Sequence, residues 1–234
     1  MERINKEVSV VFPAFNERES IEACILVAHC ALKEMVKNFE IIIVNDGSTD
    51  GTGDICESLA KKLGNIKVID KKVNEGYGFA LRDGFRAARY ELAVFLDADR
   101  QFDIFNLKDL LRYADSYDVV VGYRKHREDP LQRKIFSFGY NMIIKLLFRL
   151  DVRDINCAFK LFKKDFLDKI ELKSRQYFIN TELLAKAKVM GKKVKEVPVA
   201  HFPRYEGVSK VGYSDIPRTL REIANIYKST RSAK

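Results

Sequence analysis

Short apolar runs alternate with amphipathic segments along the first half of the chain. In the segment 19–37, for example, Ile21, Ile25, Ala28 and Leu32 recur at the spacing of one helix face. The apolar runs predict strands over 8–12, 41–44, 66–69, 92–96 and 119–121, and the intervening segments predict helices over 19–37, 51–63, 79–90 and 106–114. Continuous apolar strands separated by amphipathic helices indicate a mostly parallel α/β sheet with helices on both faces.

The second half has a less regular pattern. It predicts helices over 130–150, 180–190 and 217–228, strands over 159–162 and 194–197, a loop over 204–212 and a polar tail. No Gly/Ser-rich linker or internal repeat interrupts the chain. We therefore expect residues 1–234 to form a single domain.

Composition and charge restrict the partners. The 234 residues are 47% hydrophobic and 32% charged, as in a globular domain with an ordinary core. The net charge of +9 favours anionic partners such as nucleotides, lipid phosphates, acidic membranes or nucleic acid. The four cysteines show no metal-binding spacing and are interpreted as reduced thiols of a cytosolic protein. There is no apolar signal segment and no run near the roughly 18 apolar residues of a membrane span, so we expect a soluble or peripheral protein.

The strongest chemical signal is Asp97-Ala98-Asp99, which directly follows the predicted strand 92–96. Ligands of open α/β sheets bind at the carboxyl ends of the strands. Carboxylate oxygens there suit Mg²⁺ or Mn²⁺, and such an ion can carry a substrate diphosphate. The alternative is an acidic turn that caps the following helix.

Three further motifs follow the earlier strands. Pro13–Glu17 is either a wall for a nucleoside or simply a helix start, where Glu17 interacts with the helix dipole. In Asn45–Gly51, Asp46 is a candidate acceptor for a base or ribose, although the segment also reads as a turn with helix caps. The glycines of Asn74–Gly78 would permit close approach of a ligand. Neither a GxGxxG motif nor a phosphate-binding P-loop is present.

These four motifs, in this order, resemble those of glycosyltransferase family 2, which has the GT-A fold. More narrowly, they resemble the dolichol-phosphate mannose synthase branch of polyprenyl-phosphate glycosyltransferases, over about residues 7–215. The resemblance implies a nucleotide-sugar half over about 1–122 and an acceptor half over about 123–215, followed by a C-terminal amphipathic helix and tail over 216–234.

The resemblance also implies roles for individual residues. The residues implied to line the nucleotide are Pro13, Phe15, Glu17, Val44, Asp46, Asp97 and Ala98. The implied ligands of Mg²⁺ or Mn²⁺ are Asp97, Asp99 and Gln101. The implied catalytic residues are Asp99, Arg124, Arg133 and Ser137, of which Arg124, Arg133 and Ser137 would orient the acceptor phosphate, and the residues of the loop closing over the diphosphate are Arg204 and Lys210. The chain departs from the branch at Phe102–Phe105, where His-Pro-Pro is usual after the glutamine, and at Asn156–Lys160, where Gly-Phe-Arg is common.

The expected activity is transfer of a hexose, with inversion, from a nucleotide sugar to a polyprenyl or dolichyl phosphate, and GDP-mannose is the favoured donor. A phosphate acceptor needs no strong general base, because its second pKa lies near 6. A sugar acceptor would need one, with Asp154 and Glu182 as candidates. The alternatives are a family 2 enzyme that uses a UDP-sugar (glucose or N-acetylglucosamine) with a lipid-phosphate or glycan acceptor, a nucleotidyltransferase, and a nucleotide- or RNA-binding protein without transferase activity. Nucleic acid is not the expected partner, because a carboxylate-rich edge repels phosphate unless a cation intervenes.

Residues 135–150 combine aromatic and aliphatic side chains with spaced bases. Such a segment is either a helix lying in a membrane interface or an ordinary core helix. The basic residues Arg221, Lys228, Arg231 and Lys234 near the carboxyl end would suit an anionic leaflet. We therefore expect a cytoplasmic protein with peripheral contact to the cytoplasmic face of a membrane.

Overall fold

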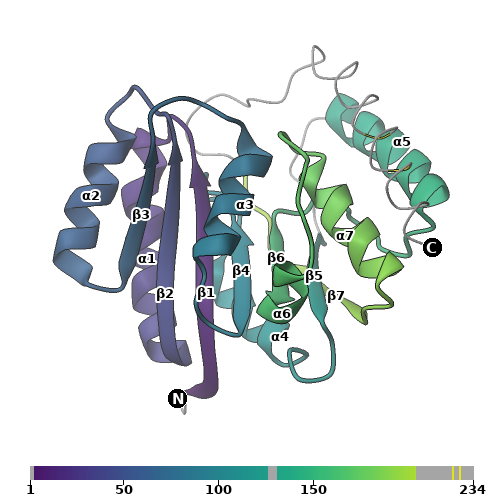
Figure 1. The fold of residues 1–234 in the computed structure, drawn as a ribbon, viewed down its shortest axis with the longest axis horizontal. Helices are drawn as coiled ribbons and strands as arrows, with labels where there is room; N and C mark the ends of the chain where they lie inside the picture. Colours follow the sequence, from purple (N-terminus) through teal and green to yellow (C-terminus); the bar gives the residue numbers. More distant parts are fainter. Residues whose placement is uncertain (1–2, 126–130, 204–222, 224–226, 228–234) are drawn as a thin grey trace.

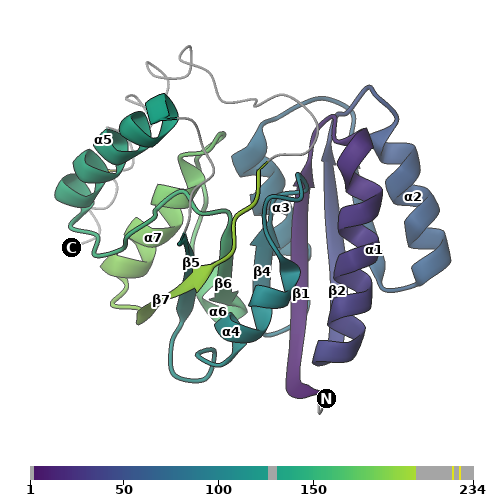
Figure 2. The same ribbon diagram turned by 180° about the vertical axis from the view of Figure 1, so that it is seen from behind.

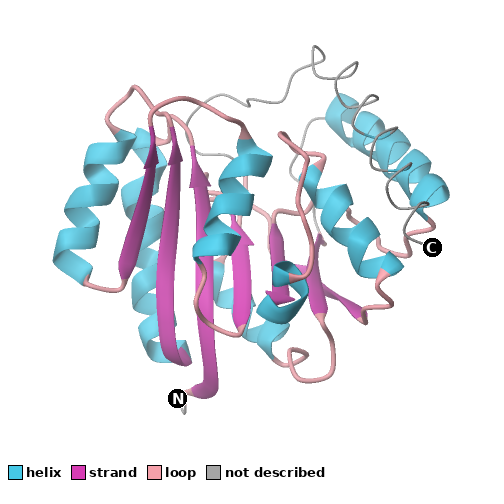
Figure 3. Ribbon diagram, viewed as in Figure 1, coloured by secondary structure: helices cyan, strands magenta, loops and turns pink. Residues whose placement is uncertain are grey.

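A twisted sheet runs through the middle of the protein, and helices cover both of its faces (Figure 1, Figure 3). The computed structural model describes residues 3–125, 131–203, 223 and 227, with the side chains of 131–137 outside the description. The strands are β1 (Ile4–Ala14), β2 (Val36–Asp46), β3 (Ile66–Lys71), β4 (Leu92–Leu96), β5 (Val119–Arg124), β6 (Phe159–Lys163) and β7 (Val194–Val199). The helices are α1 (Arg18–Met35), α2 (Thr52–Leu63), α3 (Tyr77–Ala87), the 3-10 helix η1 (Ile104–Asn106), α4 (Leu107–Leu111), α5 (Leu131–Phe148), α6 (Lys164–Asp168) and α7 (Ile179–Val189).

The strand order in the described residues is β3-β2-β1-β4-β6-β5-β7. Neighbours are parallel from β3 to β4 and again between β5 and β7, whereas β6 runs antiparallel to both β4 and β5. The carboxyl ends of β1, β2 and β4 therefore lie at the same edge. The motifs that follow these strands are gathered there.

Alternating side chains of the strands form two apolar layers. Val10 and Phe12 of β1 pack with α1, α2 and α4 on one face, which is turned to the viewer in Figure 2. Val11 points to the opposite face, where α3, α6 and α7 cover the sheet in Figure 1. Ile144 and Phe148 of α5 join this second layer. Burial of both faces explains why the strands are continuous apolar runs.

The predicted α/β architecture with a mostly parallel sheet is confirmed, but several boundaries differ. The helix expected to run to residue 37 ends at Met35, and β2 begins at Val36, where the backbone is already extended. The helix expected over 106–114 is divided into η1 and a short α4. Helix α6 was missed in the sequence pattern. The predicted loop 204–212 and most of the predicted helix 217–228 lie outside the described residues.

Candidate active site

The Asp97–Asp99 turn is held in place by side chains of helix α1. The Ala98 carbonyl oxygen accepts hydrogen bonds from Ser20 Oγ at 2.7 Å and from Cys24 Sγ at 3.2 Å. Burial raises the pKa of the Cys24 thiol to about 12, so the thiol keeps its proton and remains a donor. Two side chains one helical turn apart thus fix the peptide between the two carboxylates. Sequence reasoning missed both residues, because their target lies more than 70 positions away.

The backbone reverses immediately after this turn. Arg100 has φ of 60°, a left-handed conformation that non-glycine residues seldom adopt. Asp99 Oδ1 accepts the Gln101 backbone N–H at 3.1 Å, and this bond supports the reversal. The Gln101 side chain turns toward the segment after β7, where its Nε2 donates to the Phe202 carbonyl at 3.2 Å. The three predicted metal ligands therefore come from one short, tightly connected turn.

The donor set of this turn suits a hard cation. Two carboxylates and one amide within five residues leave coordination positions for diphosphate oxygens, which is how Mg²⁺ is commonly bound in nucleotide sites. Within the described part of the chain there is no cluster of three or more His, Cys, Asp or Glu side chains arranged to hold a metal by themselves. The chemistry of Asp97, Asp99 and Gln101 fits an ion shared with a substrate, and their role as ligands stays a prediction.

Asp97 also contacts helix α3. The Tyr77 hydroxyl donates to Asp97 Oδ1 at 2.8 Å. Burial, and next the nearby Asp97 charge, raise the pKa of Tyr77 well above its usual value, so the phenol remains a donor. Tyr77 lies in the Asn74–Gly78 motif. From the sequence, the glycines of this motif were interpreted as permitting close approach of a ligand, whereas Tyr77 was assigned no role.

Asp46 binds backbone N–H groups of the Asn74–Gly78 loop. Its Oδ1 and Oδ2 accept the N–H groups of Glu75 and Gly76 at 3.0 and 2.8 Å, and Lys71 Nζ lies 3.5 Å away. The carboxylate is almost fully buried. These contacts give Asp46 a structural role in the Asn74–Gly78 loop, and its predicted contact with a nucleoside stays untested.

The glycines of that loop allow another segment of the protein, residues 174–175, to pack closely against it. A Cβ on Gly76, where φ is 109°, would lie 2.4 Å from the Arg175 carbonyl oxygen, and one on Gly78 would lie 2.1 Å from the Ser174 carbonyl oxygen. The Gly78 N–H donates to the Arg175 carbonyl at 2.8 Å. The close approach that the sequence indicated is therefore to residues 174–175.

The residues predicted to line the nucleotide occupy two kinds of position. Phe15 and Glu17 are half-buried at the sheet edge, where Glu17 Oε2 accepts from Ser20 Oγ at 3.2 Å. The side chains of Pro13, Val44 and Ala98 are buried. Val44 is fully enclosed in the apolar layer beneath α3, so its side chain belongs to the core.

Arg124 is paired with Asp154 in a two-pronged ion pair. Arg124 Nε and an Nη donate to the two carboxylate oxygens at 2.7 and 2.9 Å, and both side chains are about nine-tenths buried. This geometry orients the guanidinium firmly. It also gives Asp154 a partner other than an acceptor hydroxyl, so the general-base role considered for it gains no support.

Glu182, the other candidate base, is fully buried. Its carboxylate accepts the backbone N–H groups of Lys173 and Ser174 at 2.8–3.1 Å and pairs with Lys186 at 3.1 Å. These bonds shape the segment that packs against Gly76 and Gly78. Glu182 is therefore a structural carboxylate in this arrangement.

The acceptor residues expected on the next helix are described only in part. Arg133 and Ser137 lie on α5, with side chains outside the described residues, and Arg204 and Lys210 lie outside them entirely. The Tyr140 hydroxyl, further along α5, is 2.9 Å from Thr181 Oγ1 in the first turn of α7. This contact ties α5 to α7.

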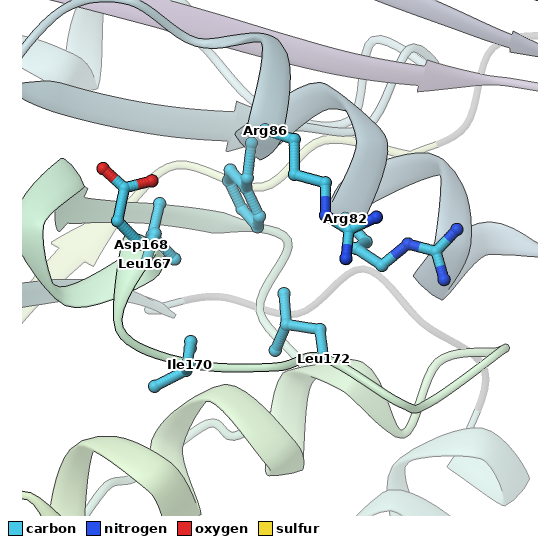
Figure 4. A pocket seen from close by; sticks show the side chains of 7 residues that line it. Arg82, Arg86, Leu167, Asp168, Ile170 and Leu172 are labelled. Atoms are coloured by element: carbon cyan, nitrogen blue, oxygen red, sulfur yellow. The ribbon is translucent and has the colours of Figure 1, made fainter.

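A small cavity of about 30 Å³ lies between the second half of α3 and the segment after β6 (Figure 4). Its lining consists of Arg82, Phe85, Arg86, Leu167, Asp168, Ile170 and Leu172. This volume holds about one water molecule. It is far too small for a nucleotide sugar.

Known proteins are similar to this chain over most of its length. A family model described as glycosyl transferase family 2 matches residues 9–171. Glycosyltransferase AglD of Haloferax volcanii is 33% identical over 208 residues, covering 85% of this chain and 33% of that protein. Undecaprenyl-phosphate 4-deoxy-4-formamido-L-arabinose transferase of Serratia proteamaculans is 32% identical over 229 residues, covering 96% of this chain and 69% of that protein. This chain thus spans about a third of the first relative and about two thirds of the second.

The solved structure of glucosyl-3-phosphoglycerate synthase from Mycobacterium tuberculosis, in complex with Mn²⁺, UDP and glucosyl-3-phosphoglycerate, has a TM-score of 0.70 to this chain. It is 19% identical, and the match covers 96% of this chain and 80% of that one. At this identity the similarity demonstrates a shared fold. The fold expected from the sequence is therefore confirmed.

Proposed function

Because the chain belongs to glycosyl transferase family 2, we propose that it transfers a sugar from a nucleotide sugar to a polyprenyl phosphate. The acceptor class is supported by relatives named for undecaprenyl phosphate and, in Rhizobium johnstonii, for dodecaprenyl phosphate, which match 96% and 94% of this chain. The observation that carries the donor site is the Asp97–Asp99 turn, fixed at the carboxyl end of β4 by contacts from α1 and α3.

In the proposed reaction an oxygen of the acceptor phosphate attacks the anomeric carbon of the donor sugar. A new carbon–oxygen bond forms as the bond from that carbon to the nucleoside diphosphate breaks, with inversion. The products are a polyprenyl-phosphate sugar and a nucleoside diphosphate. The phosphate acceptor is already largely ionised near neutral pH, so no strong base is needed. The engagement of Asp154 by Arg124, and of Glu182 by backbone N–H groups, supports this choice over a sugar hydroxyl.

The chain's own residues bind and orient the reactants. Asp97, Asp99 and Gln101 would hold Mg²⁺ or Mn²⁺, which when bound neutralises the charge on the departing diphosphate. Arg204 and Lys210 would add positive charge at the same place. The acceptor phosphate would be oriented by Arg124, Arg133 and Ser137.

GDP and UDP are the two candidate nucleotides of the donor. The resemblance of the sequence motifs to the mannose synthase branch favours GDP-mannose, whereas the solved structures of similar fold contain UDP with Mn²⁺ or Mg²⁺. Incubation with labelled GDP-mannose or UDP-sugars, a polyprenyl phosphate and Mn²⁺, followed by solvent extraction, tests both. We expect lipid-extractable label from one donor class and its loss on chelation. Label that stays in the aqueous phase with every donor would refute the proposed transfer.

Access to a lipid acceptor would come through helix α5. Its outer face exposes large apolar side chains, among them Phe138 (71% exposed) and Leu146 (80% exposed), whereas Ile144 and Phe148 point into the core. Arg149 at its end is also exposed. Among the described helices none is long and apolar enough to cross a bilayer. We propose that this face lies on an anionic membrane surface, on the cytoplasmic side.

Co-sedimentation with vesicles containing phosphatidylglycerol tests this surface. Leu146→Asp should weaken binding about tenfold, because the leucine would no longer be buried in the interface. Val27→Asp, at an apolar residue of α1 that is 52% exposed, is the matched control and should bind normally. Equal binding by Leu146→Asp and the wild type would exclude α5 as the contact.

A further inference from the structure

Tyr77 contacts one of the two carboxylates of the Asp97–Asp99 turn. Its hydroxyl group donates to Asp97 Oδ1 at 2.8 Å, and the tyrosine is the first residue of α3. Rotation of a carboxylate changes which oxygen faces a bound ion. A hydrogen bond to one oxygen therefore selects the orientation in which Asp97 meets its ligand.

The Tyr77 ring is itself held by a second aromatic residue. The rings of Tyr77 and Tyr177 have centroids 5.0 Å apart at an interplanar angle of 31°. The two segments approach closely enough because Gly76 and Gly78 lack a Cβ facing residues 174–175. Tyr177 lies two residues before the first residue of α7, so the position of the ring pair depends on where that helix begins.

The start of α7 is anchored from inside the core. Lys160 of β6 is fully buried, and its Nζ donates to Asn180 Oδ1 at 2.5 Å and to the Cys157 carbonyl oxygen. The Asn180 backbone N–H in turn donates to the Tyr177 carbonyl at 3.2 Å. Lys160 pairs in register with Phe95 of β4, two residues before Asp97. The same short stretch of sheet thus supports both ends of the Tyr77–Asp97 contact.

We propose that Tyr77 is a positioning residue of the donor site, which fixes the Asp97 carboxylate for metal-dependent binding of the nucleoside diphosphate. Lys160, through Asn180 and Tyr177, holds Tyr77 in place for this task. The inference rests on the proposed function, since it assigns Asp97 to the donor. It adds a residue outside the predicted ligand set.

Tyr77→Phe removes the hydroxyl and keeps the aromatic stack, so the fold should be unchanged. In the full chain we expect the Kd for UDP or GDP in the presence of Mn²⁺ to rise about tenfold, the loss typical of a hydrogen bond to a charged group. In the transfer reaction the KM for the nucleotide sugar should rise by a similar factor with kcat nearly constant, because Asp97 holds the diphosphate before and during transfer. The KM for the lipid phosphate should not change.

Two further variants separate positioning from a general structural effect. Tyr113→Phe removes a hydroxyl from a half-buried tyrosine that packs edge-to-face against Tyr117 away from the site, and should leave all constants unchanged. Lys160→Met should raise the Kd for the nucleotide in the same direction as Tyr77→Phe. A purely structural role for Tyr77 would instead lower the thermal midpoint of the free protein while sparing the Mn²⁺-dependent Kd.

The outcomes distinguish this inference from the proposed function. Unchanged Mn²⁺-dependent nucleotide affinity in Tyr77→Phe overturns the positioning role alone. A wild type that binds the nucleotide with Mn²⁺ but transfers nothing to lipid phosphate overturns the acceptor assignment, while the binding comparison still decides the role of Tyr77. Nucleotide binding by the wild type that is indifferent to Mn²⁺ overturns the metal role of Asp97, and with it the positioning role of Tyr77, while transfer to the lipid phosphate is tested separately.

Discussion

Replacing Lys160 by methionine measures how much the buried amino group of this residue lowers the free energy of unfolding. The side chain is fully buried, and Nζ lies 5.3 Å from the centre of the Phe95 ring. Burial is the main reason that the pKa of Lys160 falls from 10.5 to about 8. Among the surrounding groups, Cys157, Asp154 and Asp97 raise this pKa and Arg124 lowers it. Together they do not offset the loss of water.

The sign of the pH effect follows from this lowered pKa. Below about pH 8 the amino group is protonated in both the folded and the unfolded chain, and the buried charge opposes folding. Between pH 8 and 10.5 the folded protein has released the proton while the unfolded chain still binds it, so stability from this residue rises with pH. The separation of the two pKa values corresponds to about 3 kcal/mol.

Urea unfolding of the wild type and of Lys160→Met between pH 7 and pH 10.5 provides the assay. The variant leaves Asn180 Oδ1 and the Cys157 carbonyl without this donor, a cost that does not depend on pH. We therefore expect the wild type to gain about 3 kcal/mol relative to the variant across this range. Lys67→Met, at an exposed lysine of β3, should show a constant difference from the wild type. A constant difference for Lys160→Met as well would refute the reasoning.

Three other predictions concern the site and its support. Asp99→Ala should abolish transfer and Mn²⁺-dependent nucleotide binding. Asp103→Ala is the control, because Asp103 also accepts the backbone N–H two residues further on, and it should retain both activities. Full activity of Asp99→Ala would exclude the metal assignment. In the same urea titration, Gly78→Ala should reduce the free energy of unfolding by about 2 kcal/mol, because its Cβ would meet the Ser174 carbonyl oxygen. Gly139→Ala on α5 is the control: its Cβ meets nothing within 4 Å, so the substitution should be neutral or stabilising. Arg133→Ala should raise the KM for lipid phosphate about tenfold with less effect on the nucleotide sugar; equal losses in steady-state kinetics would remove its acceptor role.

The sheet could be predicted from hydrophobic periodicity because its strands are buried on both faces. The runs 41–44, 66–69, 92–96 and 119–121 all lie inside observed strands. Periodicity carries no information about strand direction, so the antiparallel insertion of β6 between β4 and β5 was not foreseen. The start of β2 was assigned to a helix, because residues 36 and 37 continue the pattern of α1.

The site could be predicted only as far as its motifs. The order of strand-end motifs located the Asp97–Asp99 turn, but the contacts of that turn with Ser20 and Tyr77 depend on tertiary packing. The same limit applies to carboxylates whose partners are backbone N–H groups. Asp46 and Glu182 were interpreted as functional candidates, and the structure shows both bound to the protein's own main chain.

In the proposed reaction the acceptor oxygen belongs to a lipid phosphate. The most direct measurement compares a polyprenyl phosphate with the matching polyprenol, using the donor selected above with Mn²⁺, and identifies the product by mass. We expect a sugar joined to the lipid through phosphate and formed from the phosphorylated lipid alone. A glycoside formed equally well from the alcohol would contradict it, because the reaction would then require a general base that neither Asp154 nor Glu182 is placed to provide.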